Sequence, residues 1–295
     1  MRIHRQTAFA LVTLFFCVSL TDQADAGFER RFIGARALGV SGALTAFGDG
    51  PWCFYFNPAR TAEMNQIDAF YSPAYFGLQE IRSTGIAFSN QSFGINYAAA
   101  VHTFGFELYR ETVFSLNLSL PVYDFLFFGS NANLNHLSIK DYGVDLALSI
   151  DAGARMFVSD HFAVGFSVTN LNSSSMTLSN DPLPQAFAGG VAYVSDKLNI
   201  GVDYYKELGF PSSVRIAAEF SPLYFITFRT GTASGTNSFS AGLSLKLFPF
   251  EIGYGGMFHR IIGTTHSFGI TFNLGENTGS EFERAQRSRK KFKGR

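Results

Sequence analysis

The chain has 295 residues, no formal net charge and only 16 % charged residues, so no bulk field draws it to nucleic acid or an acidic substrate. Aromatic residues also make up 16 %, with 34 phenylalanines, yet no stretch beyond residue 30 is apolar for the roughly 18 residues that a membrane-spanning helix needs. A chain this apolar must distribute its hydrophobic residues by alternation, which favours β structure.

The first 26 residues have the three parts of a cleaved signal peptide. A basic start precedes an apolar stretch at 8–20, and the small residues at 24–26 form a cleavage site. The sequence therefore predicts an exported protein. Cleavage removes Cys17 and leaves Cys53 as the one cysteine, so a disulfide framework is excluded and Cys53 is expected to be a buried thiol.

Residues 27–64 are rich in glycine and show no sustained period of two. Within them, residues 47–60 (FGDGPWCFYFNPAR) hold the one tryptophan of the chain, Trp52, and a run of aromatics. Asn is a favoured N-cap and Pro a favoured first helical residue, so Asn57-Pro58 predicts the start of a short helical turn. This segment is expected to lie apart from the strands that follow it.

From about residue 65 the sequence alternates between apolar and small or polar residues. In residues 111–120 (ETVFSLNLSL), Phe114, Leu116 and Leu118 share one face, while small and polar residues share the other. The same pattern predicts further strands at 142–150, 161–169, 239–247 and 266–274.

Two architectures fit this alternation. In a soluble sandwich the apolar face points into a shared core, whereas in a transmembrane barrel it meets lipid and the polar face lines the lumen. The predicted strands have the length of about 9–11 residues that a tilted membrane strand needs, longer than the usual 5–6. Together with the signal peptide and the low charge, this favours an all-β, transmembrane antiparallel barrel.

The length of the repetitive region bounds the number of strands. The 210 residues from 65 to 274, shared among 14 strands, give 15 for each strand with its connection. Eight strands would need about 26 residues each, which the turn signals at Pro182/Pro184, 209–211, Ser221-Pro222 and 231–235 do not allow. We therefore expect about 14 strands, with 12 as the alternative.

The C-terminal residues 275–295 differ from the rest of the chain. They carry seven Lys/Arg and three Asp/Glu, which gives this tail a net charge of +4. The sequence predicts a disordered, basic periplasmic tail, with contact to an anionic surface or a periplasmic partner as the alternative.

Residues 34–60 carry a motif seen in one group of outer-membrane proteins. Arg36-Ala37, Gly39, Gly42-Ala43, Ala46, Asp49 and Phe56-Asn57-Pro58-Ala59 resemble the N-terminal signature of PorV/PorQ-type proteins, within the FadL-like barrel superfamily. The resemblance implies a fourteen-strand barrel at 65–274 whose residues 27–64 plug the lumen as a hatch. It assigns hatch or gating roles to Arg36, Gly39, Gly42, Asp49, Trp52, Phe56, Asn57, Pro58 and Ala59.

The resemblance also implies a function in the bacterial outer membrane. FadL-like members pass hydrophobic small molecules across this membrane, and that is the function expected here. The alternative is a PorV/PorQ-like component of a type IX-like secretion or scaffold complex, whose partners would be other secretion proteins. The short connections of this chain leave little room for large extracellular loops that would dock cargo.

No motif in the sequence indicates an enzyme, a metal site or a cofactor. The histidines are scattered, and neither a nucleophile elbow nor a phosphate-binding loop is present. Several charges do fall on the polar strand faces and are expected to point into the lumen, because a charge facing lipid costs about 2–4 kcal/mol. These residues are Asp145, Asp203, Arg215, Glu219, Arg229, Lys246 and Glu251. We expect them to pair across strands or with the N-terminal segment.

Overall fold

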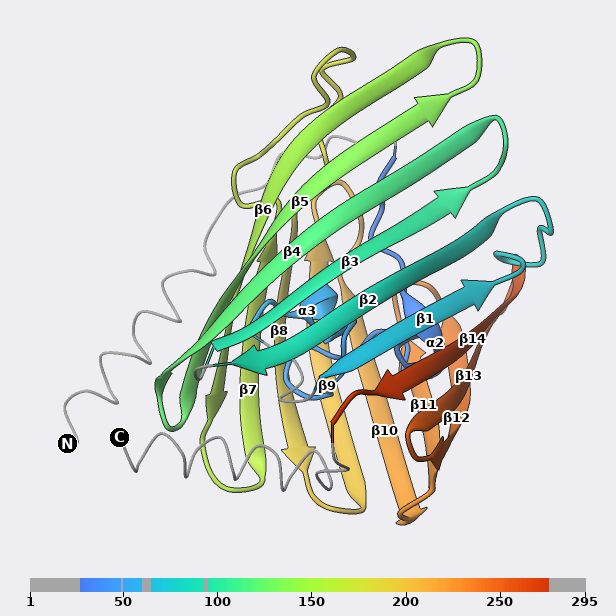
Figure 1. Ribbon diagram of the computed structural model, residues 1–295. Coiled ribbons are helices and arrows are strands. Elements are labelled where there is room, and N and C mark those ends of the chain that lie inside the picture. Colours follow the sequence, from blue (N-terminus) through green and yellow to red (C-terminus); the bar gives the residue numbers. More distant parts are fainter. Residues whose placement is uncertain (1–26, 49, 60–64, 93–94, 276–295) are drawn as a thin grey trace.

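The computed structural model describes residues 27–48, 50–59, 65–92 and 95–275. Fourteen antiparallel strands form a closed barrel in which β1 pairs with β14 (Figure 1). The predicted count of 14 is confirmed, and the alternative of 12 is wrong. The signal peptide predicted at 1–26 lies outside the described residues, as does the basic tail apart from Gly275, and both stay predictions.

Each predicted strand overlaps an observed one, and 142–150, 161–169 and 266–274 extend one residue beyond it. The strands are β1 (Gln66–Ser72), β2 (Arg82–Ser92), β3 (Ile95–Gly105), β4 (Tyr109–Tyr123), β5 (Leu126–Ile139), β6 (Gly143–Phe157), β7 (Phe162–Thr169), β8 (Ala186–Val194), β9 (Leu198–Glu207), β10 (Ser213–Leu223), β11 (Ile226–Ala233), β12 (Ser238–Leu247), β13 (Phe250–His259) and β14 (Gly263–Asn273). Two predicted turns are wrong by a few residues, because Ser221-Pro222 and Gly231 still belong to β10 and β11. Pro222 is tolerated there because the register of β10 against β11 shifts between Phe220 and Leu223.

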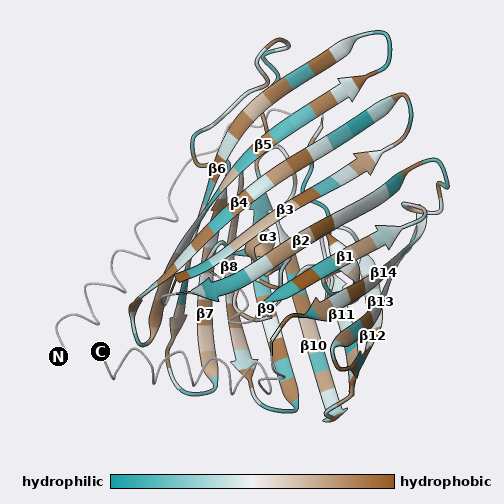
Figure 2. Cartoon of the chain, in the orientation of Figure 1, coloured by the Kyte–Doolittle hydropathy of each residue, from teal (hydrophilic) through white to brown (hydrophobic). Residues whose placement is uncertain are grey.

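The wall is apolar outside and polar inside. In β4, Leu116 and Leu118 are 65 % and 60 % exposed, whereas Asn117 and Ser119 between them are buried. Hydrophobic and hydrophilic residues alternate in this way along the strands (Figure 2). This pattern fits a barrel in lipid, because a soluble sandwich would bury its apolar face. Among the described residues, no helix has the length and apolar character needed to cross a membrane.

The two ends of the barrel differ in their connections. At one end, which we call the turn end, β1 begins, β14 finishes and strands are joined by tight turns such as Asp124-Phe125 and Tyr224-Phe225. At the other, the loop end, residues 73–81 and 170–185 make longer connections. Transmembrane barrels in general have short turns on the periplasmic side and longer loops on the outer side.

The loop at 170–185 makes hydrogen bonds to β6 where the wall lacks a strand partner. Strand β6 pairs with β7 only through residues 152–157, so its first half lacks a strand neighbour on that side. There the backbone N–H of Leu171 donates to the Ile150 carbonyl at 2.7 Å, and that of Thr177 to the Leu146 carbonyl at 2.9 Å. The loop thus satisfies backbone groups that the short β7 leaves unpaired.

The N-terminal residues 27–48 and 50–59, which we call the lumen segment, lie inside the barrel (Figure 1). They contain two short helices, α2 (Gly34–Gly39) and α3 (Cys53–Phe56), and α2 contacts β11 to β14 and β1. The Ala-Arg-Ala-Leu run of α2 consists of strong helix formers. Val40, Leu44, Phe47 and Phe54 of this segment are fully buried, so the lumen segment supplies the apolar core.

Leu116→Lys tests the lipid-facing side of the wall. Leu116 is central in β4, so the charge would face the middle of the bilayer and cost about 2–4 kcal/mol of folding free energy. Refolding into phospholipid vesicles, titrated with guanidinium, measures this loss. The control Leu178→Lys lies in the 170–185 loop, is 79 % exposed and should change stability by less than about 0.5 kcal/mol. Equal losses in the two variants would contradict a lipid-facing β4.

Candidate functional site

The lumen segment separates two cavities. The loop-end chamber has a volume of about 50 Å³ and is lined by the first residues of the segment, by Tyr55, by the 170–185 loop and by β3 to β9. The turn-end chamber is larger, about 540 Å³, and is lined by α2 and by β1 and β9 to β14. Any molecule that crosses the barrel along its axis must therefore pass or displace the lumen segment.

A four-residue ion network joins α2 to the wall in the turn-end chamber. The Arg36 guanidinium binds the Glu219 carboxylate through two hydrogen bonds, at 2.7 Å from Nε and 2.6 Å from Nη2. Arg229 donates to the same carboxylate at 2.8 Å and lies 3.6 Å from Glu251. Bidentate arginine–carboxylate pairs are the stronger, geometrically specific kind. This network fastens α2 to β10, β11 and β13.

A second anchor holds the aromatic part of the segment against β1. The Trp52 indole N–H donates to the Asp68 carboxylate at 2.8 Å, and the Thr271 hydroxyl donates to its other oxygen. The Trp52 ring stands edge-on to Phe70, with ring centroids 5.1 Å apart. Trp52 and the adjacent Cys53 are both buried.

Asn57 occupies the point where the segment turns toward the first strand. Its backbone is extended, so α3 ends there, and its Oδ1 accepts a hydrogen bond from the Ala59 N–H at 3.0 Å. Its Nδ2 donates to the carbonyls of Thr45 at 2.7 Å and Ala154 at 3.1 Å, and the Pro58 carbonyl accepts from Asn117 at 2.9 Å. Asn57 therefore caps a turn as predicted, while the helical continuation would fall in 60–64, outside the described residues.

The wall is shaped for contact with the backbone of the segment. A Cβ on Gly165 would lie 2.0 Å from the Thr45 carbonyl oxygen, and one on Gly255 would lie 2.1 Å from that of Ala35. A Cβ on Gly129 or Gly231 would likewise lie 2.1 or 2.5 Å from the backbone of the segment, and one on Gly153 or Gly201 would lie 2.2 Å from its side chains Asn57 and Phe47. Such distances exclude any side chain, so these glycines form a seat for the lumen segment.

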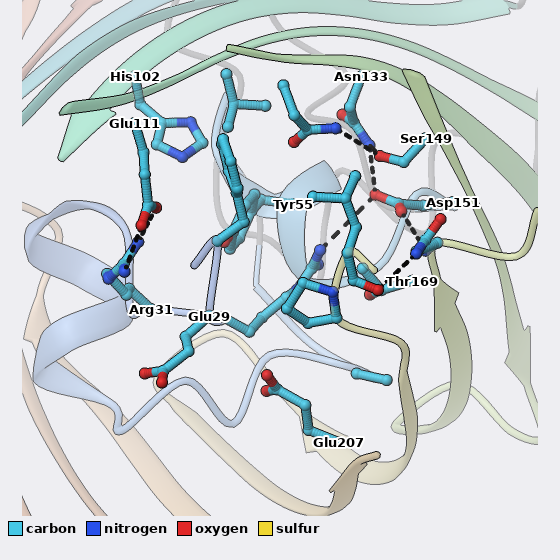
Figure 3. A pocket seen from close by; sticks show the side chains of 18 residues that line it. Glu29, Arg31, Tyr55, His102, Glu111, Asn133, Ser149, Asp151, Thr169 and Glu207 are labelled. Atoms are coloured by element: carbon cyan, nitrogen blue, oxygen red, sulfur yellow. Dashed lines mark hydrogen bonds and ion pairs between the residues drawn. The ribbon is translucent and has the colours of Figure 1, made fainter. Parts of the chain in front are cut away.

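The loop-end chamber contains two arginines from the start of the segment (Figure 3). Arg31 binds Glu111 through two hydrogen bonds, at 2.5 and 3.1 Å, and its guanidinium lies 3.5 Å from the centre of the Phe104 ring. Arg30 lies 3.7 Å from the Asp151 carboxylate and 4.1 Å from the centre of the Tyr55 ring. Each arginine thus has one carboxylate and one aromatic face.

Tyr55 and Asp151 connect these arginines to the wall. Burial raises the pKa of the Tyr55 hydroxyl, against the opposing effect of Arg30 and Arg31, so Tyr55 is neutral at pH 7. Asp151 accepts hydrogen bonds from the side chains of Asn131 and Asn133 at 3.1 and 3.0 Å. It also accepts one from the backbone N–H of Asn170 at 2.9 Å.

The structure brings most of the predicted charges to the lumen. Glu219, Arg229, Lys246 and Glu251 line the turn-end chamber. Asp203 accepts from the Thr45 N–H at 2.8 Å, and the Arg215 guanidinium lies over the rings of Tyr205 and Phe32, at 3.7 and 5.1 Å.

Asp145 differs from the other predicted charges. Its carboxylate accepts from the backbone N–H groups of Leu178 and Ser179, at 2.9 and 2.8 Å, so it fastens the 170–185 loop.

The predicted hatch residues are placed as follows. Arg36, Trp52, Asn57, Pro58 and Ala59 make the contacts described above, and Phe56 is buried. The α2 backbone meets β12 at Gly39, where a Cβ would be 3.1 Å from the Gly242 Cα, and Gly42 has a φ of +66°. Asp49 lies outside the described residues, so its assignment stays a prediction.

Sequence reasoning missed the charges of the loop-end chamber. Glu111 lies on the polar face of the strand predicted at 111–120, and Asp151 lies one residue beyond the strand predicted at 142–150, so following the alternation to these two positions would have found them. Arg30 and Arg31 precede the recognised motif and carry no periodic signal. In the part of the chain that the structure describes, no group of three or more His, Cys, Asp or Glu is arranged to hold a metal ion.

No protein-family model matches the sequence, and no curated protein matches it. Solved structures do match. The CymD monoaromatic hydrocarbon channel has a TM-score of 0.62 at 12 % identity, covering 85 % of this chain and 100 % of that chain. A Pseudomonas aeruginosa FadL homologue gives 0.58 at 12 % identity, with 85 % and 100 % covered. The Pseudomonas putida toluene transporter TodX gives 0.60 at 10 % identity, with 87 % and 99 % covered. The chain therefore has a FadL-like fold.

Gly165→Ala tests the seat of the lumen segment. The new methyl group would collide with the Thr45 carbonyl and displace the segment, at a cost of about 1–3 kcal/mol. The matched control is Gly189→Ala on the neighbouring strand, where a Cβ would meet only the Phe166 ring at 3.5 Å, an ordinary contact. We expect the melting temperature in detergent to fall in Gly165→Ala and to stay unchanged in Gly189→Ala. A seat made of freely movable backbone would instead leave the two melting temperatures equal.

Proposed function

We propose that this protein is an outer-membrane barrel that carries hydrophobic small molecules across the outer membrane, with the lumen segment as its plug. The observation that carries the proposal is a FadL-like barrel whose lumen segment divides the passage into two chambers. The names of two similar structures, a monoaromatic hydrocarbon channel and a toluene transporter, support this choice of cargo. We assign the chain no catalytic role.

The outer surface supports the proposed location. Exposed apolar side chains cover the strands, and aromatic residues such as Tyr123, Phe125, Tyr224 and Phe248 are exposed at the turn end. Aromatic rings of this kind gather at the two interfaces of membrane barrels. We propose that the turn end faces the periplasm, because transmembrane barrels have their short turns on that side.

The contacts that hold the plug can be replaced by contacts with water or with a ligand. Its attachments to the wall include the Arg36–Glu219 pair and the hydrogen bonds of Trp52 and Asn57, in addition to apolar packing. Polar groups released from these contacts can bind water or a passing ligand, so they keep hydrogen-bond partners when the segment moves. We propose that the ion network around Glu219 is the latch of the plug.

The secretion-complex alternative rests on a sequence resemblance, chiefly the motif at 34–60. In the described residues, the connections at the loop end are short except for 73–81 and 170–185, and the latter is bound to the edge of β6. Little surface is left for docking a protein cargo. We therefore place transport first and retain the PorV/PorQ-like role as the second hypothesis, to be supported by co-purification with other envelope proteins.

Uptake of a hydrophobic dye tests the proposed function. Bacterial cells that produce the protein should take up N-phenylnaphthylamine faster than cells that lack it, because intact outer membranes exclude this dye. A hydrophilic sugar of similar size should enter the two kinds of cell equally, since the plug closes the aqueous route. Dye uptake equal to that of cells without the protein would count against transport.

Arg36→Gln tests the latch. The change removes the bidentate pair but leaves Arg229 beside Glu219, so we expect a loss of about 1–2 kcal/mol and a roughly 5- to 30-fold larger population of open barrels. Swelling of proteoliposomes in small sugars measures that population. Arg110→Gln is the control, because it removes the same charge from an exposed position on β4. If Arg36→Gln swells no faster than Arg110→Gln, the network is not a latch.

A further inference from the structure

The charges that line the loop-end chamber do not balance. Its two arginines, Arg30 and Arg31, face four carboxylates, those of Glu29, Glu111, Asp151 and Glu207. Arg31 is occupied by Glu111 and Arg30 lies beside Asp151. Two carboxylates, those of Glu29 and Glu207, therefore have no ion pair with another described residue, and Figure 3 shows no bond from either to the residues drawn.

Glu207 is the more informative of the two. The residue is only 6 % exposed, and its Oε2 accepts a hydrogen bond from the Tyr205 hydroxyl at 2.6 Å. Its Oε1 is buried and has no hydrogen-bond partner in the described chain. Figure 3 shows the carboxylate directed into the chamber. A buried acceptor without a donor is costly, so this oxygen is a site for a donor brought by a ligand.

The two arginines of the chamber differ in how they are bound. Arg31 is held by two hydrogen bonds to Glu111 and is covered by the Phe104 ring. Arg30 lies 3.7 Å from Asp151 and against the Tyr55 ring, but it makes no hydrogen bond to a described residue. Arg215 lies behind Tyr205 and outside this chamber, and Asp203 is its cross-strand neighbour. A ligand carboxylate would therefore enter a chamber whose lining carries more carboxylates than arginines.

We propose that the loop-end chamber recognises the ammonium head of a small hydrophobic amine, with Glu207 as the direct acceptor and Glu29 as a supporting charge. The volume of about 50 Å³ suits such a head group more than a whole large ligand. The apolar part of the molecule would contact Phe28, Tyr55 and Leu183, which also line the chamber. This inference rests on the proposed function, because it names the class of molecule that the same passage accepts.

Three water-soluble probes that share a benzene ring test the preference of the loop-end chamber for an ammonium group. They are benzylamine, benzyl alcohol and phenylacetate. Their binding to the full mature protein in detergent at pH 7.5 is measured by calorimetry and by the fluorescence of Trp52, the one tryptophan of the chain. We expect benzylamine to bind about tenfold more tightly than benzyl alcohol, and phenylacetate to bind most weakly, since hydrogen bonds to charged groups contribute about 1.5–3 kcal/mol.

Glu207→Gln should weaken benzylamine binding about tenfold and leave benzyl alcohol within about twofold. Glu80→Gln, which removes the same charge from an exposed residue of the 73–81 loop, should leave the order of the three probes unchanged. Phenylacetate binding as tightly as benzylamine, no binding of any probe, or a preference unaffected by Glu207→Gln would overturn the proposal. The first of these needs no variant, so it holds even if Glu207→Gln fails to fold.

A failure of the proposed function can be distinguished from a failure of the amine site. If the hydrophobic dye does not enter cells through the protein but benzylamine still binds at Glu207, transport is wrong and the amine site remains. If the dye enters but the three probes show no order, transport stands and the amine preference is wrong.

Discussion

A wall of fourteen strands encloses more space than its own inward side chains fill, and this constraint shapes the rest of the molecule. Barrels of about eight strands are filled by side chains alone, and the interior widens with each added strand. Here the inward residues are mostly small, so the lumen segment supplies Val40, Leu44 and Phe47 as a core. Close packing is possible because wall glycines such as Gly165 and Gly255 let backbone meet backbone.

The lumen is polar, so filling it creates a second requirement. Inward polar groups that lose water need new partners, and the lumen segment provides them in both halves of the barrel. Its carbonyl groups accept from Asn117 and Asn131, and its arginines bind Glu111 and Glu219. The lumen segment supplies no hydrogen-bond donor to Oε1 of Glu207. This oxygen is among the buried polar atoms that find no hydrogen-bond partner in the described chain, and we propose that a ligand supplies its donor.

Much of the wall was predictable. A period of two reports which face of a strand each side chain occupies, so Leu116 outside and Asn117 inside could be assigned without a structure. The exact turns were less accessible, because Pro222 lies at a register shift that local sequence does not reveal. The partners of the charges were also hidden: alternation places Glu219 inward, but only folding brings Arg36, 183 positions away, to its carboxylate.

The sequence by itself favoured an apolar-outside, polar-inside barrel of about 14 strands and determined an N-terminal segment distinct from the wall, because periodicity can be read along the chain; the structure decided between 14 strands and 12. The tertiary structure decided how the charges pair and where the two chambers lie. It also decided that Asp145 holds a loop, whereas Asp151 meets Arg30. These features depend on contacts between strands and the lumen segment, and such contacts form only when the closed wall fixes which residues face one another.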